Sequence, residues 1–403
     1  MRLSYYKLSF IFVLAIFILV GCGEQGSINP INNGNSTAEH YIVVLKTTNG
    51  IQSVDASKNE IQSFINSHNI NQSALGHIYG SVVKGFSADL TAEQINQFSK
   101  DPQVAYIEKD QVMSIIIQPD VRIVNPKDNT LQSQYLPWGI ARVGGPSSAT
   151  SFSKAWIVDT GIYLTHSDLN VNTSLSRTFV RYGIDATTPN DYNGHGTHCS
   201  GIIAAKNNSF GVVGVSPNAQ VIAVKVLYYN GSGYLSDIVA GLDYVYANAS
   251  TGDVVNCSWG GGASTTIDNA ISQFATRNAG SGPFVSVSIA AGNSYANANY
   301  YSPARVNGTG IYTVSAFGSG DVFAYFSNWA NPPIDFSGPG INILSTYKNN
   351  QYAYMSGTSM AAPHICGIIL AREAAGYPPS AGPATNGYVS SDPDGTPDAI
   401  AHE

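Results

Sequence analysis

The chain has 403 residues, a hydrophobic content of 43% and a formal net charge of −7. This length suits two ordinary domains, and a charged fraction of only 11% excludes a chain that is disordered throughout. The negative balance and the absence of a Lys or Arg cluster argue against nucleic acid as the main partner.

The N-terminal segment 1–21 is predicted to be a signal peptide of the lipoprotein type. Arg2 and Lys7 give it a positive start, and the apolar run from Leu8 to Val20 is shorter than the roughly 20 residues of a membrane span. Small residues then lead directly to Cys22, as in a bacterial lipobox, so Cys22 is the predicted lipidation site. The alternative is an ordinary signal peptide with an incidental cysteine. Residues 22–40 are predicted to be a flexible polar tether.

Residues 41–117 are predicted to form a small α+β domain. Apolar strands and two amphipathic helices alternate in the order βαββαβ, which is typical of a ferredoxin-like unit. The second helix begins with the capping pattern Thr91-Ala92-Glu93-Gln94. Residues 118–134 contain Pro119 and Pro126 and are predicted to be a processing linker. The predicted strands are 41–45, 75–79, 82–86 and 104–107, and the first helix is 57–68.

Residues 135–376 are predicted to form an α/β domain. Short apolar strands alternate with helical segments, which indicates a mostly parallel, doubly wound sheet with helices on both faces. In such sheets, functional groups collect at the carboxyl ends of the strands. The tail 377–403 is predicted to be a surface-hugging or mobile extension. The expected strands are 155–158, 221–227, 254–257, 284–290 and 311–314, and the clearest helix is 235–248.

The cysteines that follow Cys22 do not form a disulfide framework. Cys199, Cys257 and Cys366 allow at most one bridge, and their apolar surroundings predict three buried thiols instead.

Ser359 is a candidate nucleophile. It lies in the string Gly357-Thr358-Ser359-Met360-Ala361, at the start of a predicted helix where free N–H groups and the helix dipole favour negative charge. A serine hydroxyl needs a base to take its proton. The alternative is a Gly-Thr-Ser sequence that only caps the helix.

His195 is the candidate for that base, and for the acid that later protonates the leaving amine. Gly194 and Gly196 flank it at the start of a helix predicted to run to about Lys206. A metal site built from His195 and His198 is the competing interpretation. No Glu follows in the zinc-protease pattern, so His198 is expected to be structural.

Asp159 and Asn293 complete the set. Asp159 follows a predicted strand and would orient the imidazole and stabilise the imidazolium. The amide of Asn293, with the backbone N–H of Ser359, would bind the oxyanion. Taken alone, each could simply be a turn residue.

The strings around Asp159, His195, Asn293 and Ser359, in this order, resemble the subtilisin family of serine endopeptidases, and within it the proteinase K-like enzymes. The resemblance covers residues 41–117 and about 136–375. It implies a subtilisin-like fold, and it implies that residues 41–117 are an inhibitory propeptide, so that the chain is a zymogen.

The resemblance also implies a cleft in which an extended substrate lies as an added strand. Because main-chain hydrogen bonds ignore side-chain identity, broad specificity is expected. The small residues Ala290, Ala291 and Gly292 would line an apolar pocket for the residue before the scissile bond. Trp259 is expected at the surface of the cleft, with a place in the core as the alternative. The two edges of the cleft would be Gly231, Ser232 and Gly233, and Ser258, Trp259 and Gly260.

Calcium is an open question at the level of sequence. Asp335 matches a calcium-ligand position of proteinase K-like enzymes, but the acidic loops of the family's other calcium sites are not evident. The chemistry itself requires no cofactor, so any calcium here would be structural.

The predicted function is therefore that of an exported serine endopeptidase. Its partners would be polypeptide substrates and its own propeptide, with the membrane contacted only through a lipid on Cys22, and it is expected to be a monomer. The lipidated precursor would be held at the bacterial cell envelope, and a cut between about 118 and 135 would release the catalytic domain outside. The alternatives are a catalytically silent peptide-binding lipoprotein and an esterase, although Gly357 to Ala361 lacks the final Gly of the esterase pattern Gly-x-Ser-x-Gly.

Overall fold

The computed structural model describes residues 38–47, 54–118, 120–124 and 131–403. The predicted signal peptide, Cys22 and most of the polar tether lie outside the described residues. Within the ranges given, no helix is both long enough and apolar enough to cross a membrane.

The N-terminal domain has the predicted βαββαβ order, with its strands in the antiparallel order β2-β3-β1-β4. Ile61, Phe64 and Ile65 recur at helical spacing on α1 and are buried against this sheet. The side chain and backbone of Thr91 complete the predicted capping box with Gln94. The elements are β1 (Glu39–Leu45), α1 (Val54–Ser67), β2 (Leu75–Tyr79), β3 (Gly85–Leu90), α2 (Ala92–Phe98) and β4 (Val104–Lys109).

The C-terminal domain is built on an 11-stranded sheet with the strand order β21-β22-β18-β16-β14-β12-β7-β10-β8, to which β9 and β17 are added at the side. The pairs from β22 to β8 along this order are parallel, while β21 and β17 pair antiparallel with their neighbours. The strands are β7 (Lys154–Asp159), β8 (Asn170–Val171), β9 (Arg177–Thr178), β10 (Gln220–Lys225), β12 (Val254–Cys257), β14 (Ser286–Ala290), β16 (Ile311–Gly318), β17 (Val322–Phe323), β18 (Ile334–Pro339), β21 (Ala384–Tyr388) and β22 (Ala399–His402).

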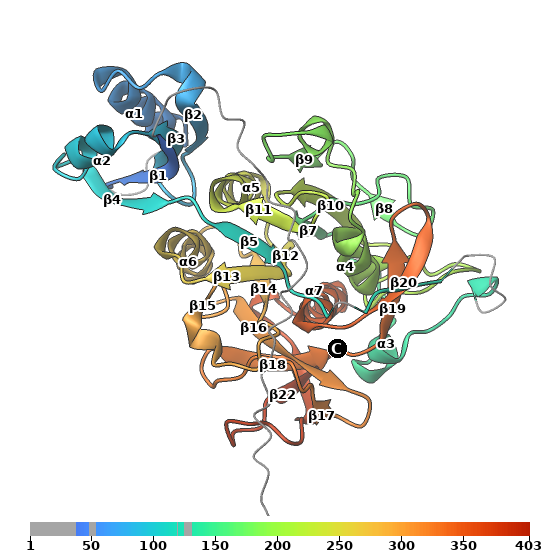
Figure 1. The fold of residues 1–403 in the computed structure, drawn as a ribbon. Helices are drawn as coiled ribbons and strands as arrows, with labels where there is room; N and C mark the ends of the chain where they lie inside the picture. Colours follow the sequence, from blue (N-terminus) through green and yellow to red (C-terminus); the bar gives the residue numbers. More distant parts are fainter. Residues whose placement is uncertain (1–37, 48–53, 119, 125–130) are drawn as a thin grey trace, which may run out of the picture. The chain divides into compact units, whose positions relative to one another are not determined.

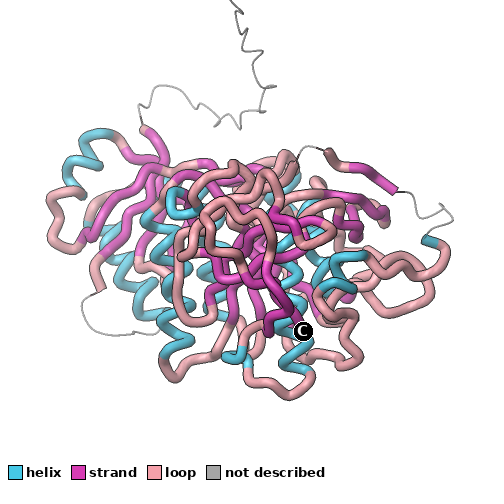
Figure 2. The backbone as a smooth tube through the Cα atoms, turned by 90° about the horizontal axis from the view of Figure 1, so that it is seen from below, coloured by secondary structure: helices cyan, strands magenta, loops and turns pink. Residues whose placement is uncertain are grey.

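Helices cover both faces of this sheet, which confirms the predicted doubly wound class (Figures 1 and 2). Successive residues of β7 point to opposite faces: Trp156 belongs to the core under α5 and α6, and Ile157 to the core under α4 and α7. Aliphatic side chains make up most of both cores. The helices are α3 (Trp138–Arg142), α4 (His195–Ala204), α5 (Leu235–Asn248), α6 (Thr265–Ala279) and α7 (Thr358–Ala374).

Two smaller sheets involve the segment that joins the domains. In one, the order is β11-β5-β13-β15, and in the other it is β19-β20-β6. The segment expected to be a linker from residue 118 therefore contains a short strand, β6, that pairs with β20 of the C-terminal domain. The strands are β5 (Val112–Ile115), β6 (Arg122–Val124), β11 (Ser232–Tyr234), β13 (Trp259–Gly262), β15 (Tyr301–Ser302), β19 (Ile343–Tyr347) and β20 (Gln351–Met355).

The C-terminal extension, expected to be either surface-hugging or mobile, is joined to the main sheet. β22 adds to β18 in parallel, with Ser337 opposite Ile400, and the Ile400 side chain is fully buried. Although the tail is rich in Pro, Gly and Asp, it extends the main sheet, because the short apolar run at 399–401 finds an unpaired strand edge.

Candidate active site

Asp159 and His195 form a buried hydrogen-bonded pair. Asp159 is the last residue of β7 and His195 the first residue of α4, so both lie at the carboxyl end of the sheet. Nδ1 of His195 lies 2.8 and 2.9 Å from the two carboxylate oxygens of Asp159, and both side chains are fully buried. This contact fixes the imidazole so that Nε2 faces away from Asp159.

Ser359 lies in the first turn of α7, as its motif predicts. Its hydroxyl donates a hydrogen bond to the carbonyl of Ser258 at 2.9 Å and accepts one from the backbone N–H of Ile116 at 3.2 Å. α7 packs against α4, and the Cys199 thiol, one turn after His195, lies 3.5 Å from the carbonyl of Ser359. Nε2 of His195 is buried and has no hydrogen-bond partner in the described part of the chain, so a proton-accepting nitrogen remains available.

The side chain of Asn293 is held by its oxygen, and its amide N–H₂ has no hydrogen-bond partner among the described residues. Its side-chain oxygen accepts hydrogen bonds from both N and Oγ1 of Thr358, each at 2.9 Å. Its Nδ2 is buried and has no partner among the described residues. A Cβ at Gly357, where φ is +151°, would lie 2.6 Å from the carbonyl oxygen of Ile116 and 2.9 Å from this nitrogen. Glycine at position 357 therefore keeps open the space between a carbonyl and the amide donor.

The cleft is filled by β5 of the joining segment. β5 runs antiparallel to β11 on one side and to β13 on the other, with Ser114 opposite both Ser232 and Gly260. The N–H of Ile115 also donates to the carbonyl of Gly231 at 2.9 Å, and beyond the site the N–H of Gln118 donates to the carbonyl of Ser356 at 2.8 Å. The two predicted edges thus hold a polypeptide between them, and that polypeptide belongs to the same chain.

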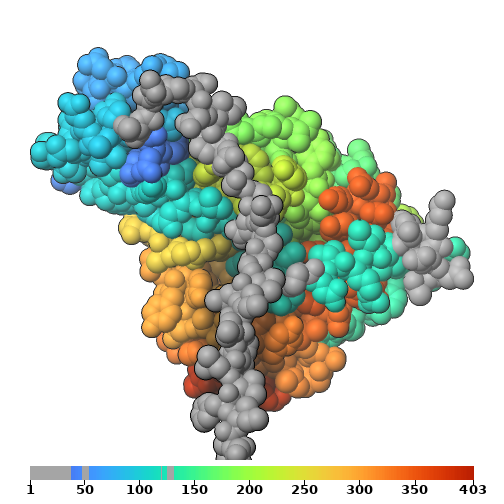
Figure 3. Space-filling model, viewed as in Figure 1, coloured from blue at the N-terminus to red at the C-terminus, as the bar shows by residue number. Residues whose placement is uncertain are grey.

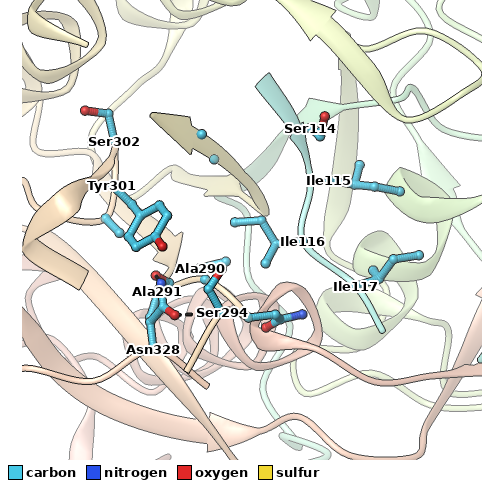
Figure 4. A pocket seen from close by; sticks show the side chains of 15 residues that line it. Ser114, Ile115, Ile116, Ile117, Ala290, Ala291, Ser294, Tyr301, Ser302 and Asn328 are labelled. Carbon is cyan, nitrogen blue, oxygen red and sulfur yellow. Dashed lines mark hydrogen bonds between the residues drawn. The ribbon is translucent and has the colours of Figure 1, made fainter. Parts of the chain in front are cut away.

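Ile116 lies at the predicted pocket and forms part of its wall. The cavity that it lines together with Ala290, Ala291 and Gly292 measures about 250 Å³. Figure 4 shows the Ile116 side chain directed toward Tyr301 and Ala290, while Ile115 and Ile117 point to the other side of the strand. A Cβ at Gly260 would lie 3.0 Å from Cδ1 of Ile116, so the pocket wall is close-fitting at this point.

The expectation for Trp259 was wrong in one respect. Its backbone pairs with Ile115 in the cleft, but its side chain is fully buried and its indole N–H donates to the carbonyl of Val158 at 2.8 Å. Because side chains alternate along β13, which lies between β5 and β15, residue 259 points into the core while Gly260 lies on the other face, against Ile116.

His198 has the structural role that was expected. Its Nε2 lies 2.9 Å from the carbonyl of Ala353 and 3.1 Å from that of Ile343. Burial lowers the pKa of His198 to about 3, so the ring stays neutral. Burial and the nearby Asp159 charge raise the pKa of the Cys199 thiol, so this group stays protonated beside the imidazole. Cys199, Cys257 and Cys366 are all buried free thiols, as predicted.

Asp335 remains a calcium-ligand prediction. One of its oxygens accepts the N–H of Thr313 at 2.8 Å, and burial raises the pKa of its carboxyl to about 6. Calcium needs 6–8 oxygen ligands. Within the described ranges, the sets of three or more ligating side chains that come together do not include Asp335. Its chemistry suits calcium only with backbone carbonyls as the other ligands.

Sequence reasoning missed the residues that occupy the cleft. It identified residues 112–117 only as the end of the N-terminal domain. The run Ile115-Ile116-Ile117 was the available signal, because a second apolar strand after β4 has no place in a βαββαβ unit whose sheet is already complete. Ser258 was expected at the edge of the cleft, but the role of its carbonyl as the acceptor for Ser359 was not predicted.

The strand between β11 and β13 shows a cleft that holds a polypeptide in extended form. The subtilase family model matches residues 156–380, and the peptidase inhibitor I9 model matches residues 40–115. The chain therefore belongs to the subtilase family of serine-type peptidases, with an inhibitor I9 domain in front of its peptidase domain.

Individual relatives agree with this assignment. Proteinase R of Parengyodontium album is 31% identical over 350 residues, which cover 83% of this chain and 79% of that protein. Alkaline serine exoprotease A of Vibrio alginolyticus is 34% identical over 82% of this chain, but the chain spans only 60% of that relative's length. The crystal structure of a cold adapted subtilisin-like serine proteinase aligns with a TM-score of 0.56 at 32% identity, covering 66% of this chain and 97% of that one.

Proposed function

We propose that this chain is the zymogen of a serine endopeptidase that cuts itself between Ile116 and Ile117. Ser359 would attack the Ile116 carbonyl, His195 would take the hydroxyl proton and pass it to the leaving amine, and Asp159 would hold the imidazole. The free amide of Asn293 and the N–H of Ser359 would bind the oxyanion. The single observation that carries the proposal is the 3.2 Å contact between Ile116 N and Ser359 Oγ, within a strand held on both sides.

The inhibitor role of the N-terminal domain is supported by how its body contacts the peptidase domain. Glu108 accepts hydrogen bonds from the N–H and hydroxyl of Thr266 in the first turn of α6, at 2.9 and 2.6 Å. Asp110 accepts the same pair of bonds from Ser236 in the first turn of α5, at 3.0 and 2.6 Å. Two carboxylates thus cap two helix N-termini, where the dipole favours negative charge. Figure 3 shows the blue and teal surface of this domain against the yellow-green and yellow surface of the peptidase domain.

The peptidase domain also contacts the inhibitor domain through a carboxylate of its own. Asp243 on α5 accepts hydrogen bonds from the backbone N–H groups of Gly80, Ser81 and Val82, at distances of 2.6 to 3.1 Å. After a cut at Ile116, these contacts and the strand pairing of β5 would keep the inhibitor domain in place. The proposed product is therefore a complex that stays inactive until the inhibitor leaves or is degraded.

The proposed specificity is broad, with an apolar residue before the cut. β11 and β13 bind β5 mainly through backbone groups, and the pocket around Ile116 is walled by small residues. Export as a lipoprotein with release of the cut domain remains part of the proposal, and it depends on Cys22. Calcium at Asp335 would stabilise the fold and take no part in the chemistry.

Intact-mass and peptide mass spectrometry of the wild-type chain and of Ser359→Ala tests the proposal. The wild type is expected to yield a fragment that begins at Ile117, while Ser359→Ala stays uncut. The same spectra show whether Cys22 carries lipid. An uncut wild-type chain whose Ser359 also fails to react with a fluorophosphonate would support the silent peptide-binding alternative. A self-made cut elsewhere would retain the peptidase and overturn only the proposed bond.

A further inference from the structure

A second buried carboxylate lies behind the Asp159–His195 pair. Asp191 is 1% exposed and lies four residues before His195, in the loop that leads into α4. Sequence reasoning assigned it no role. It contacts neither the bound strand nor the nucleophile, and the mechanism above does not use it.

Asp191 joins the two segments that carry Asp159 and His195. One of its oxygens accepts hydrogen bonds from the N–H groups of Asn193 and Gly194, at 2.9 and 2.8 Å, and from the hydroxyl of Thr160 at 3.0 Å. The other oxygen accepts hydrogen bonds from the N–H and the hydroxyl of Thr197, at 3.0 and 2.6 Å. All of these donors are neutral, and they come from both sides of the pair.

Thr160 completes the connection. Its hydroxyl donates to Asp191 and accepts the N–H of Gly196 at 3.0 Å, and its own N–H donates to the Asp159 carboxylate at 2.6 Å. Its carbonyl accepts a hydrogen bond from the buried ammonium group of Lys225, which is also paired with Asp185 at 2.9 Å. The backbones approach closely here, since a Cβ at Gly196 would lie 2.1 Å from the carbonyl oxygen of Gly161.

We propose that Asp191 and Thr160 act as one positioning unit for the reaction: through their shared hydrogen bond they hold the imidazole of His195 in line with the Asp159 carboxylate. This inference rests on the proposed function. An amide at 191 would present N–H₂ to one of two groups of donors, so the loop and the helix start could not both keep their bonds. A shift of about 1 Å in a catalytic group costs on the order of 10² in rate.

The test uses the self-processed enzyme obtained from the full chain and a chromogenic tetrapeptide p-nitroanilide with an apolar residue before the leaving group. Active sites are counted by stoichiometric fluorophosphonate labelling. Asp191→Asn is expected to lower kcat by roughly 10²-fold and to leave KM within about twofold, because β11 and β13 are untouched. The matched control is Asp168→Asn. Asp168 is a fully buried carboxylate that, among the described residues, accepts hydrogen bonds from neutral donors on Asn208, Val212 and Tyr352. The Asp168→Asn variant is expected to have a lower thermal stability than the wild type and an unchanged kcat.

A second pair of variants decides the case if Asp191→Asn fails to mature. Thr160→Val removes the hydroxyl at nearly constant volume, and Thr160→Ser restores it. Valine is expected to lower kcat by roughly tenfold or more, while serine stays within about threefold of the wild type. Adding Thr160→Val to Asp191→Asn should lower kcat little further, since both substitutions disrupt the same hydrogen-bonded connection between residues 160 and 191.

Three results would overturn the inference: equal kcat losses in Asp191→Asn and Asp168→Asn, a change in KM at constant kcat, or a serine variant as impaired as the valine variant. These results are distinct from a failure of the proposed function itself, in which the wild type would not hydrolyse the substrate at all.

Discussion

The joining strand in the cleft and the body of the inhibitor domain are bound to the peptidase domain by different kinds of contact. β5 is held largely by backbone groups of β11 and β13, whereas the body is held by the carboxylates of Glu108, Asp110 and Asp243. Backbone pairing accepts most sequences, but capping by a carboxylate requires that side chain at that place. Under the proposed function, this difference would let the cleft accept many polypeptides while the neighbouring surface selects the inhibitor domain.

The largest expected effect comes from a substitution that removes a catalytic group and leaves the contacts of both β5 and the inhibitor domain unchanged. Asp159→Asn should reduce kcat by about 10⁴-fold, because an amide holds the imidazole in the wrong tautomer. Steady-state kinetics of any processed fraction, and the amount of uncut chain, measure this loss. Size-exclusion chromatography of the uncut variant should show the wild-type elution volume, and a loss of folding in its circular dichroism would contradict the assigned role.

Removing the oxyanion donor should have the next largest effect. Asn293→Ala is expected to lower kcat by roughly 10²–10³-fold with little change in KM, because the amide N–H₂ would donate to the charge that develops in the transition state. Asn299→Ala is a suitable control, since Asn299 is exposed and its amide contacts only the carbonyl of Pro332. An equal loss in the two variants would argue against Asn293 as the oxyanion donor.

A change in the inhibitor face should separate binding from chemistry. Glu108→Gln replaces the carboxylate at the start of α6, and a hydrogen bond to a charged group contributes about 1.5–3 kcal/mol. We expect inhibition after self-cleavage to weaken by about tenfold at unchanged kcat, measured as a shorter lag before peptidase activity appears. Glu93→Gln, at an exposed position of α2, should leave the lag as it is. A wild-type lag in Glu108→Gln would mean that the cleft strand alone maintains inhibition.

The smallest effect concerns pH. Nη1 of Arg181 lies 2.8 Å from Nε2 of His40, and burial, followed by the Arg181 charge, lowers the pKa of His40 below its ordinary 6.5. The complex therefore favours the neutral ring. The contribution of His40 is present above pH 6.5 and is lost as the pH falls through the depressed pKa.

His40→Gln isolates this contribution. The inhibition lag of the wild type should shorten on acidification below pH 6.5 more than the lag of His40→Gln. Burial raises the pKa of Asp110 to about 6, which acts in the opposite sense, but it does so in both chains and cancels in the comparison. Parallel pH profiles for the two chains would show that His40 does not contribute to the pH dependence of inhibition.

Local sequence patterns were sufficient to predict several helices and strands. The strand 254–257 and the helix 235–248 have the predicted bounds, because a short apolar run and a regular helical stripe are each defined by neighbours along the chain. The predicted strand 82–86 instead begins at Gly85 and continues to Leu90, since its limits depend on pairing with β1. The choice between a surface-hugging and a mobile tail was left open for the same reason, because a strand edge that needs a partner is visible only in three dimensions.

The sequence alone was sufficient to nominate an acid, a base, an amide donor and a hydroxyl, because each sits in a string whose chemistry is local. Only the tertiary structure could decide what lies between them. The occupation of the cleft by Ile116, the inward turn of the Trp259 side chain and the link from Asp191 to Thr160 all depend on contacts between distant segments. Such contacts are set by strand register and by packing of the two cores, which no short stretch of chain contains.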